Sequence, residues 1–307
     1  MANKNRPEEP KVCIVVLNWN GLDDTLACLS SVYQLAYSNF RVVVIDNGSA
    51  AGQAGAIREH FPKVGLIKNK ENLGFTGGCN QGIDEALKAG ADYVVLLNND
   101  TIVTEDFLSK VVDFYEKTPD AGMVSPVILY TDRKRLWFAG AKVTLGIIRH
   151  LYKGKTADDA EIPKEPFKTG YVPGTALLIS TELIKKIGSL DDRYFAYYED
   201  LDWSWKARKL GYYPYVVPSA RIYHKKSGST SEGGHKKWNK IPAYYVARNS
   251  ILLASNFTSF KKVGFILAQV FIKLPLNMIL LVKPNAWGSY LRGTGRGLSM
   301  VLMGRSG

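Results

Sequence analysis

The sequence is poor in cysteine and lacks the common nucleotide-binding loops. Its 307 residues include three cysteines that form no CxxC pair and no even framework, which argues against a disulfide scaffold or a structural zinc site and fits a reducing compartment. No GxGxxG follows the first predicted strand, and GxxxxGK followed by Ser or Thr is absent. Dinucleotide-dependent oxidoreductases and P-loop NTPases are therefore disfavoured. Residues 1–10 lack the apolar core of a signal peptide, which predicts that the bulk of the chain stays in the cytoplasm.

Acidic side chains are almost absent from the last quarter of the chain. Residues 221–307 contain 14 lysines and arginines and one acidic residue, a net charge of +13, whereas residues 1–220 are nearly balanced at −1. A basic segment could bind nucleic acid, anionic lipid or a phosphorylated substrate, because Coulomb attraction does not distinguish among polyanions. The residues next to these basic side chains are needed to distinguish between the three kinds of partner.

A hydrophobic run lies within this basic segment. As a helix, residues 263–282 would be about 30 Å long, which is the thickness of a bilayer core. Gln269, Lys273 and Asn277 recur every four residues and form a narrow polar stripe, and Pro275 interrupts the run. This pattern favours a helix lying in the membrane surface over a helix that crosses it. The alternative is a helix packed on its own domain.

The rest of the chain alternates between predicted strands and helices. Continuous apolar runs with β-branched residues predict strands buried on both faces, and amphipathic segments between them predict helices. The first half of the chain carries strands at 11–18, 41–46, 64–68, 93–97 and 122–128 and helices at 24–33, 52–61, 76–89 and 105–117. This order predicts an α/β fold with a doubly wound, mostly parallel sheet.

The second half is less regular. Residues 150–168 have no clear period and predict an exposed loop. A strand at 172–180, a short helix from 181, a helix at 199–210 and strands at 213–217 and 220–223 follow. The GSTSEGG stretch at 228–234 resembles a linker. We therefore expect an N-terminal tail at 1–10, a main α/β domain at 11–227 with halves at 11–128 and 129–227, and a basic, amphipathic helical segment at 228–307.

Polar residues follow several of the predicted strands directly. Asn18 ends the first strand and Asp46 the second, Asn72 lies in the next turn, and the fourth strand continues into Asn98-Asn99-Asp100. Ligands of open parallel sheets bind outside the carboxyl ends of the strands, where loops and helix N-termini converge. These positions are therefore the candidates for binding a nucleotide.

Six motifs together carry a family resemblance. The segments LNWNG, VIDNGS, NLGFTGGCNQG, LLNNDT, PGTALLI and YYEDLDWSWKARKLGY occur in this order. Over residues 11–250 the chain resembles the inverting family 2 glycosyltransferases with a GT-A fold, especially the rhamnosyltransferase-like branch. The resemblance implies a hexosyltransferase that uses dTDP-rhamnose or a UDP-sugar and a lipid-linked or cell-envelope polysaccharide acceptor. It would act at the cytoplasmic face of the inner membrane as a peripheral or monotopic protein.

The resemblance also implies a metal site. The family uses a DxD motif to bind Mg²⁺ or Mn²⁺ beside the leaving diphosphate, and here that motif reads Asn98-Asn99-Asp100. Asp100 keeps the last carboxylate and is the expected metal ligand, and Asn98 is left to bind sugar or ribose. His224 matches a position where related enzymes complete the metal site with an imidazole.

The remaining roles are assigned by the same resemblance. Asp46 would accept a hydrogen bond from the imide N–H of the nucleotide base, and Asn18 and Asn72 would line the donor pocket. Inverting transfer requires a carboxylate that takes the proton of the acceptor hydroxyl. The family places it in an ED motif at a helix start, and we assign Asp200 as the base with Glu199 as the residue most easily confused with it.

Two other functions remain open at this point. A nucleotidyltransferase shares the sheet and the metal, but it needs a Gly- and Arg-rich loop after the first strand, and NWNGLDD contains no arginine. A nucleic-acid-binding protein could use the basic segment, but the adjacent apolar helix favours lipid over nucleic acid. A processive synthase is disfavoured because the QxxRW motif is absent.

Overall fold

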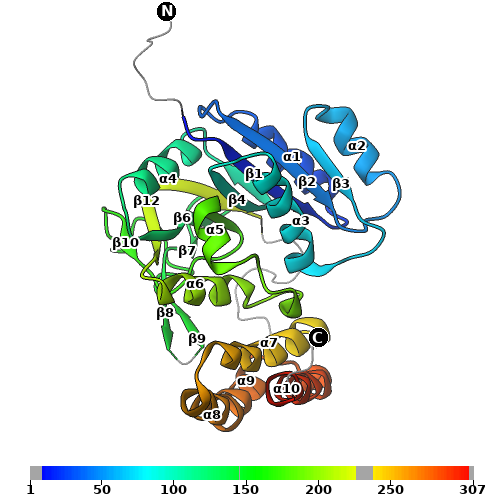
Figure 1. Cartoon of the computed structure of the whole chain (residues 1–307), viewed down its shortest axis with the longest axis vertical. Coiled ribbons are helices and arrows are strands. Elements are labelled where there is room, and N and C mark those ends of the chain that lie inside the picture. The colour runs from blue at the N-terminus through cyan, green and yellow to red at the C-terminus, as the bar shows by residue number, and fades with distance from the viewer. Residues whose placement is uncertain (1–8, 145, 226–237, 304–307) are drawn as a thin grey trace, which may run out of the picture.

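The computed structural model describes residues 9–144, 146–225 and 238–303 and confirms the α/β prediction (Figure 1). The predicted linker at 228–234 lies outside the described residues. A ten-stranded sheet forms the centre of the fold, with the path β10-β12-β6-β11-β4-β1-β2-β3 and with β5 and β7 paired to β12 and β6. The strands are β1 (Val12–Asn18), β2 (Phe40–Asp46), β3 (Gly65–Lys68), β4 (Tyr93–Asn98), β5 (Thr101–Val103), β6 (Ala121–Tyr130), β7 (Leu136–Phe138), β8 (Ala141–Thr144), β9 (Ile147–His150), β10 (Phe167–Lys168), β11 (Ala176–Ser180) and β12 (Tyr213–His224).

Helices cover both faces of the sheet, and this explains the continuous apolar runs. The helices are α1 (Leu22–Val32), α2 (Gln53–His60), α3 (Gly74–Lys88), α4 (Phe107–Glu116), α5 (Thr181–Ile187), α6 (Glu199–Lys209), α7 (Lys240–Leu252), α8 (Ser259–Ala268), α9 (Leu274–Leu280) and α10 (Trp287–Leu302). Alternate residues of β1 enter different cores: Ile14 packs with side chains of α1 and α4, and Val15 packs with those of α3 and α5. Both faces of the strand are therefore buried, as a parallel α/β sheet requires.

The parallel strands β1 to β4 are separated from β6 by an antiparallel strand, β11. β1, β2, β3 and β4 are mutually parallel, whereas β11 runs antiparallel to both β4 and β6. The predicted strand at 172–180 begins only at Ala176, because a turn at Pro173, where the Ala176 amide bonds back to the Pro173 carbonyl, precedes it. The predicted strands at 213–217 and 220–223 are one strand, β12, whose register shifts between Val217 and Arg221.

Two further sequence expectations need correction. The helix predicted at 24–33 begins at Leu22; its N-cap is Gly21, which makes no side-chain bond, and Asp23 and Asp24 lie in the first turn, where they face the positive end of the helix dipole. The predicted loop at 150–168 is irregular over most of its length, but it contains β10 near its end. The chain before it also forms an unpredicted hairpin of β8 and β9.

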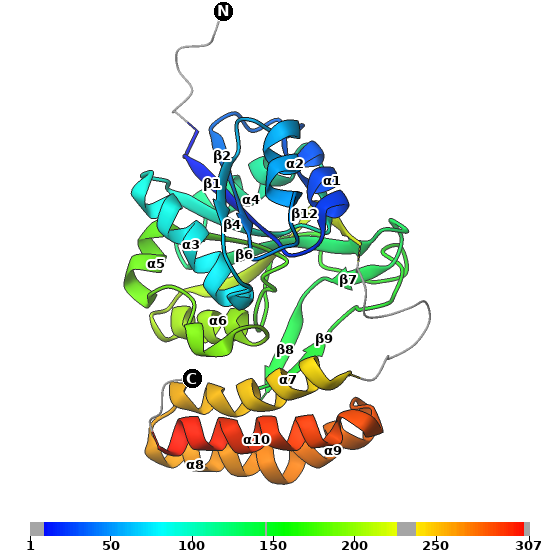
Figure 2. The same cartoon turned by 90° about the vertical axis from the view of Figure 1, so that its right-hand side faces the viewer.

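The C-terminal helices form a layer below the sheet, and α7 and α10 lie side by side (Figure 2). Two glycines of α10 allow this close approach. A Cβ atom added at Gly293 would lie 2.2 Å from the carbonyl oxygen of Tyr244, and one added at Gly297 would lie 2.6 Å from that of Arg248. Both glycines belong to the RGTGRG segment and allow helix packing.

Candidate active site

The carboxyl ends of β1 and β2 bring Asn18 and Asp46 together. Both side chains are buried, and the Asn18 amide Nδ2 donates to Asp46 Oδ1 over 3.2 Å. Asn18 Oδ1 in turn accepts from the Thr25 hydroxyl over 2.9 Å. Asp46 Oδ2 is buried and has no hydrogen-bond partner among the described residues. Asn18 therefore orients the Asp46 carboxylate and leaves one of its oxygens available as an acceptor.

A network of asparagines shapes the turn that follows β3. Asn47 is 1% exposed; its amide donates to Asn72 Oδ1 over 3.0 Å, and its Oδ1 accepts from Asn69 Nδ2 over 3.0 Å. Asn72 Oδ1 also accepts from the Gly74 amide over 2.8 Å at the start of α3. Asn72 thus holds the turn at the edge of the site. The sequence places Asn47 in the VIDNGS motif at the end of the second strand, but it did not reveal that Asn47 bonds the turn after β3.

The residues after β4 face in different directions. Asn98 is half-buried at the strand end, but the Asn99 amide donates to the Thr25 hydroxyl over 2.9 Å and to the Gly21 carbonyl, so it is bonded to the start of α1. Asp100 pairs instead with His224, because β12 runs antiparallel to β5 and aligns His224 with Thr101.

Asp100 and His224 form a compact donor pair. His224 Nε2 lies 3.0 Å from Asp100 Oδ1, and the two side chains are 7% and 10% exposed. Adjacent ligands of an octahedral Mg²⁺ or Mn²⁺ with bonds near 2.1 Å are about 3 Å apart, so the pair has the spacing of two neighbouring metal ligands. Within the described residues no cluster of three His, Cys, Asp or Glu side chains could hold a metal. The pair fits a cation that also takes oxygen ligands from its substrate.

The two carboxylates at the start of α6 differ in their surroundings. Asp200 accepts from the Leu201 amide over 2.7 Å and from the Gly174 amide over 3.2 Å. Burial raises the pKa of Asp200 to about 6, and these amides limit the rise. Glu199 is more deeply buried, its Oε2 has no partner among the described residues, and burial together with the Asp200 charge raises its pKa well above 4.5.

The turn before β11 joins Asp200 to the end of β4. Its Gly174 amide binds the Asp200 carboxylate, and the Thr175 carbonyl next to it accepts from the Asn98 amide over 2.9 Å. The half-buried Asp200 therefore lies beside the end of β4, close to the side chains that follow that strand.

The family model of glycosyl transferase family 2 matches residues 13–188. The chain belongs to glycosyl transferase family 2. This membership decides in favour of the glycosyltransferase interpretation and against the nucleotidyltransferase and nucleic-acid-binding alternatives.

Similar proteins support the rhamnosyltransferase-like resemblance. The N-acetylglucosaminyl-diphospho-decaprenol L-rhamnosyltransferase of Mycobacterium tuberculosis is 26% identical over 288 residues, which cover 80% of this glycosyltransferase and 91% of the relative. The dTDP-rhamnosyl transferase RfbF of Shigella flexneri is 23% identical over 228 residues, covering 72% and 73% of the two chains.

Solved structures support the GT-A fold. Mannosyltransferase PcManGT from Pyrobaculum calidifontis, solved in complex with GDP-Man and Mn²⁺, matches with a TM-score of 0.58 at 16% identity over 96% of this chain and 79% of that one. TarS 1-349 of S. aureus in complex with UDP-GlcNAc matches with a TM-score of 0.59 at 16% identity over 95% and 81%.

The loop before α6 of this glycosyltransferase is held in an unusual backbone conformation. Phe195, Tyr197 and Tyr198 all have positive φ angles, which are costly for residues with side chains and cluster at functional sites. Two residues of α7 hold this loop. Asn249 Nδ2 donates to the carbonyls of residues 194, 196 and 197, and Arg248 Nη2 donates to those of residues 193 and 194.

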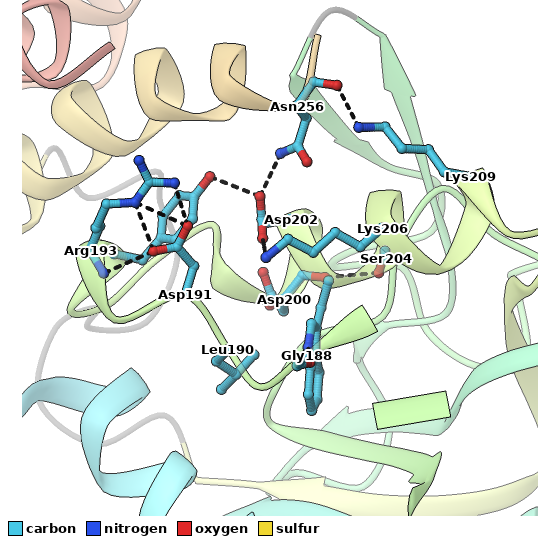
Figure 3. A network of polar contacts seen from close by, with 12 residues as sticks. Gly188, Leu190, Asp191, Arg193, Asp200, Asp202, Ser204, Lys206, Lys209 and Asn256 are labelled. Atoms are coloured by element: carbon cyan, nitrogen blue, oxygen red, sulfur yellow. Dashed lines mark hydrogen bonds and ion pairs between the residues drawn. The ribbon is translucent and has the colours of Figure 1, made fainter. Parts of the chain in front are cut away.

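A second set of contacts fixes α6 itself (Figure 3). Asp202 accepts from the Tyr194 hydroxyl over 3.2 Å and from the Asn256 amide over 2.5 Å, and it forms an ion pair with Lys206 over 2.8 Å. Sequence reasoning missed Arg248 and Asn249. The polar pair inside an otherwise apolar helical segment was the only signal, and it did not reveal which loop the two residues bind.

Proposed function

We propose that the chain is an inverting, metal-assisted glycosyltransferase that moves rhamnose from dTDP-rhamnose to a lipid-linked glycan acceptor, with Asp200 as the general base. The observation that carries the proposal is the half-buried Asp200 carboxylate at the same sheet edge as the Asp100–His224 pair. Both cited relatives are named as rhamnosyltransferases, which supports rhamnose as the transferred sugar. The decaprenyl diphosphate acceptor named for the mycobacterial relative supports a lipid-linked acceptor.

The residues divide the reaction between them. Asp46 Oδ2 accepts the imide N–H of thymine, which fixes the nucleotide at the end of β2. Asp100 and His224 would hold Mg²⁺ or Mn²⁺, which would neutralise the charge developing on the diphosphate. As the acceptor oxygen bonds to the anomeric carbon, the bond from that carbon to the diphosphate breaks and Asp200 takes the acceptor proton. A base with a pKa near 6 is largely ionised at pH 7 and still basic enough to accept it.

Attachment to the cytoplasmic face of the inner membrane is part of the proposal, and the apolar face of the helix, opposite the polar stripe, would carry it. The stripe of Gln269, Lys273 and Asn277 is buried against the chain's own residues, at 2%, 6% and 9% exposure. The opposite face is exposed and apolar. It consists of Phe260, Val263, Leu267, Phe271, Ile272, Leu276, Ile279 and Leu280.

Length and composition would also let residues 260–280 cross a membrane. A crossing helix would have to expose its three polar stripe residues to hydrocarbon, whereas in the folded chain they all face inward. Lys261, Lys262 and Lys283 flank the outward apolar face and complement anionic headgroups. These features favour a helix that lies in the membrane surface.

A donor panel tests the proposed activity. Nucleoside diphosphate release would be measured from dTDP-rhamnose, UDP-N-acetylglucosamine and GDP-mannose, with N-acetylglucosaminyl-diphospho-polyprenol as acceptor. We expect release from dTDP-rhamnose that EDTA abolishes and Mn²⁺ restores. Asp100→Ala should lose this activity, whereas Asp106→Ala, which removes an exposed partner of Lys110, should keep it. Full activity in EDTA would contradict the metal site, and a preference for another donor would contradict rhamnose.

A further inference from the structure

A buried lysine connects the outward-facing helix to the catalytic helix. Lys273 ends the π-helical turn Gln269–Lys273 between α8 and α9, and it is 6% exposed. Its Nζ donates to the Gly146 carbonyl over 2.8 Å and to the Tyr198 hydroxyl over 2.7 Å. No acidic side chain forms an ion pair with it in the described part of the chain, and burial lowers its pKa to about 7.

Tyr198 is the residue directly before the Glu199–Asp200 pair. It is the N-cap of α6, with φ at 75°, and its carbonyl accepts from the Asp202 amide over 2.9 Å. Burial raises the pKa of Tyr198, and interactions with Tyr290 and Asp200 add to the rise. A group that fixes this side chain therefore also fixes the backbone from which the two carboxylates extend.

Stability alone does not account for a lysine at this place. A buried amine without a counter-charge costs free energy that an apolar side chain of similar length would not. The turn that carries it is a π-helix, which is rare and often lies at functional sites. Residues that lower the stability of the fold are expected mainly at functional sites, and Lys273 is such a residue.

We propose that Lys273 is a positioning residue for sugar transfer. Its hydrogen bond to Tyr198 joins the helix that presents Phe271 and Ile272 outward to the first turn of α6, and it thereby sets the orientation of Asp200. The inference rests on the proposed function, in which Asp200 is the base. It adds a residue from the C-terminal helices to the catalytic arrangement.

The first test compares two buried polar residues of one stripe. Lys273→Met keeps the length of the side chain and removes the amine, and we expect kcat to fall about 10- to 100-fold because a small misplacement of a reacting group is costly. The KM for dTDP-rhamnose should be unchanged, since Asp46 and Asp100 are untouched. The control is Asn277→Leu, which removes a bond to Tyr290 of α10 and should leave kcat unchanged. An equal loss in both variants would show a general effect of the helix and overturn the proposal.

The second test asks whether the effect passes through Tyr198. Tyr198→Phe removes one oxygen and should lower kcat as Lys273→Met does, and the double variant should fall no further than either single variant. Independent losses that multiply would overturn the link. Full kcat in Tyr198→Phe would do so too, even if Lys273→Met did not fold. A wild-type chain that transfers no sugar would instead contradict the proposed function.

Discussion

The two carboxylates at the start of α6 are neighbours in sequence but differ in what surrounds them. Asp200 is half-buried and accepts two backbone N–H bonds, whereas Glu199 is buried and one of its oxygens lacks a partner among the described residues. An ordered carboxylate with a modestly raised pKa suits proton abstraction at neutral pH. At the residue scale, this difference favours Asp200 over Glu199 as the base.

Asp200→Asn tests this assignment. The amide keeps the size of the side chain but cannot accept a proton, so the transfer rate should fall by about 10²- to 10⁴-fold while donor binding is retained. Single-turnover transfer and dTDP-rhamnose titration measure the two quantities. Normal turnover in Asp200→Asn together with an inactive Glu199→Gln would move the base by one residue.

The pH dependence of the rate follows from the same side chain. The base acts in its ionised form, and burial raises the pKa of Asp200 to about 6. The rate kcat/KM should therefore fall about tenfold per pH unit below pH 6 and level off above it. Glu199→Gln should keep this acid limb. A profile that is flat from pH 5 to pH 8 would exclude Asp200 as the titrating base.

The sequence motifs predicted the positions of the site residues at the strand ends, but they did not predict the hydrogen-bond partners of these residues. Asn18, Asp46 and Asn98 end adjacent strands, because a continuous apolar run fixes where a buried strand stops. Other contacts join segments that are far apart in the sequence. Asn99 donates a hydrogen bond to Thr25 of α1, and Asn249 donates hydrogen bonds to the backbone carbonyls of residues 194 and 197. No local pattern encodes such contacts.

At the scale of elements, the sequence pattern identified most strands and helices and predicted a mostly parallel sheet, but it did not show which strands run antiparallel or which strands pair. The antiparallel β11 has the same apolar composition as the parallel strands, so composition could not reveal its reversal. The stripe of Gln269, Lys273 and Asn277 was identified correctly as one helical face. Periodicity shows that a face exists but not whether it turns inward or outward, and here it turns inward.

The packing of α7 on α10 gives a matched pair of glycine substitutions. An added Cβ at Gly293 would lie 2.2 Å from the Tyr244 carbonyl, whereas at Gly295 it would meet nothing within 4 Å. Gly293→Ala should destabilise the protein by about 1–3 kcal/mol through overpacking. Gly295→Ala should stabilise it by up to about 1 kcal/mol through helix propensity. Thermal unfolding of both variants checks this, and equal shifts would contradict the close packing.

At the scale of the whole molecule, the C-terminal helices form one layer (Figure 2), and the exposed apolar face and the flanking Lys261, Lys262 and Lys283 all belong to it. Electrostatic attraction to anionic headgroups is screened by salt, whereas apolar insertion is not. The two contributions to membrane binding can therefore be separated by ionic strength.

Serine substitutions on the outward face test this arrangement. High salt should release the wild-type chain only partly from anionic vesicles, and the triple variant Phe271→Ser, Ile272→Ser, Leu276→Ser should be released completely. Leu210→Ser alters an exposed leucine at the end of α6 and should behave as wild type. Flotation at low and high salt measures the outcome. A triple variant that stays bound at high salt would assign membrane binding to another surface.

The structure of the reaction product tests inverting rhamnosyl transfer by Asp200 most directly. The full chain would be incubated with dTDP-rhamnose, Mn²⁺ and N-acetylglucosaminyl-diphospho-polyprenol, and the lipid fraction would be analysed by mass spectrometry and by NMR of the anomeric carbon. We expect one rhamnose added to the lipid, with the anomeric configuration opposite to that in the donor, and no product from Asp200→Asn. A product with retained configuration, or rhamnose transfer by Asp200→Asn at the wild-type rate, would contradict this expectation.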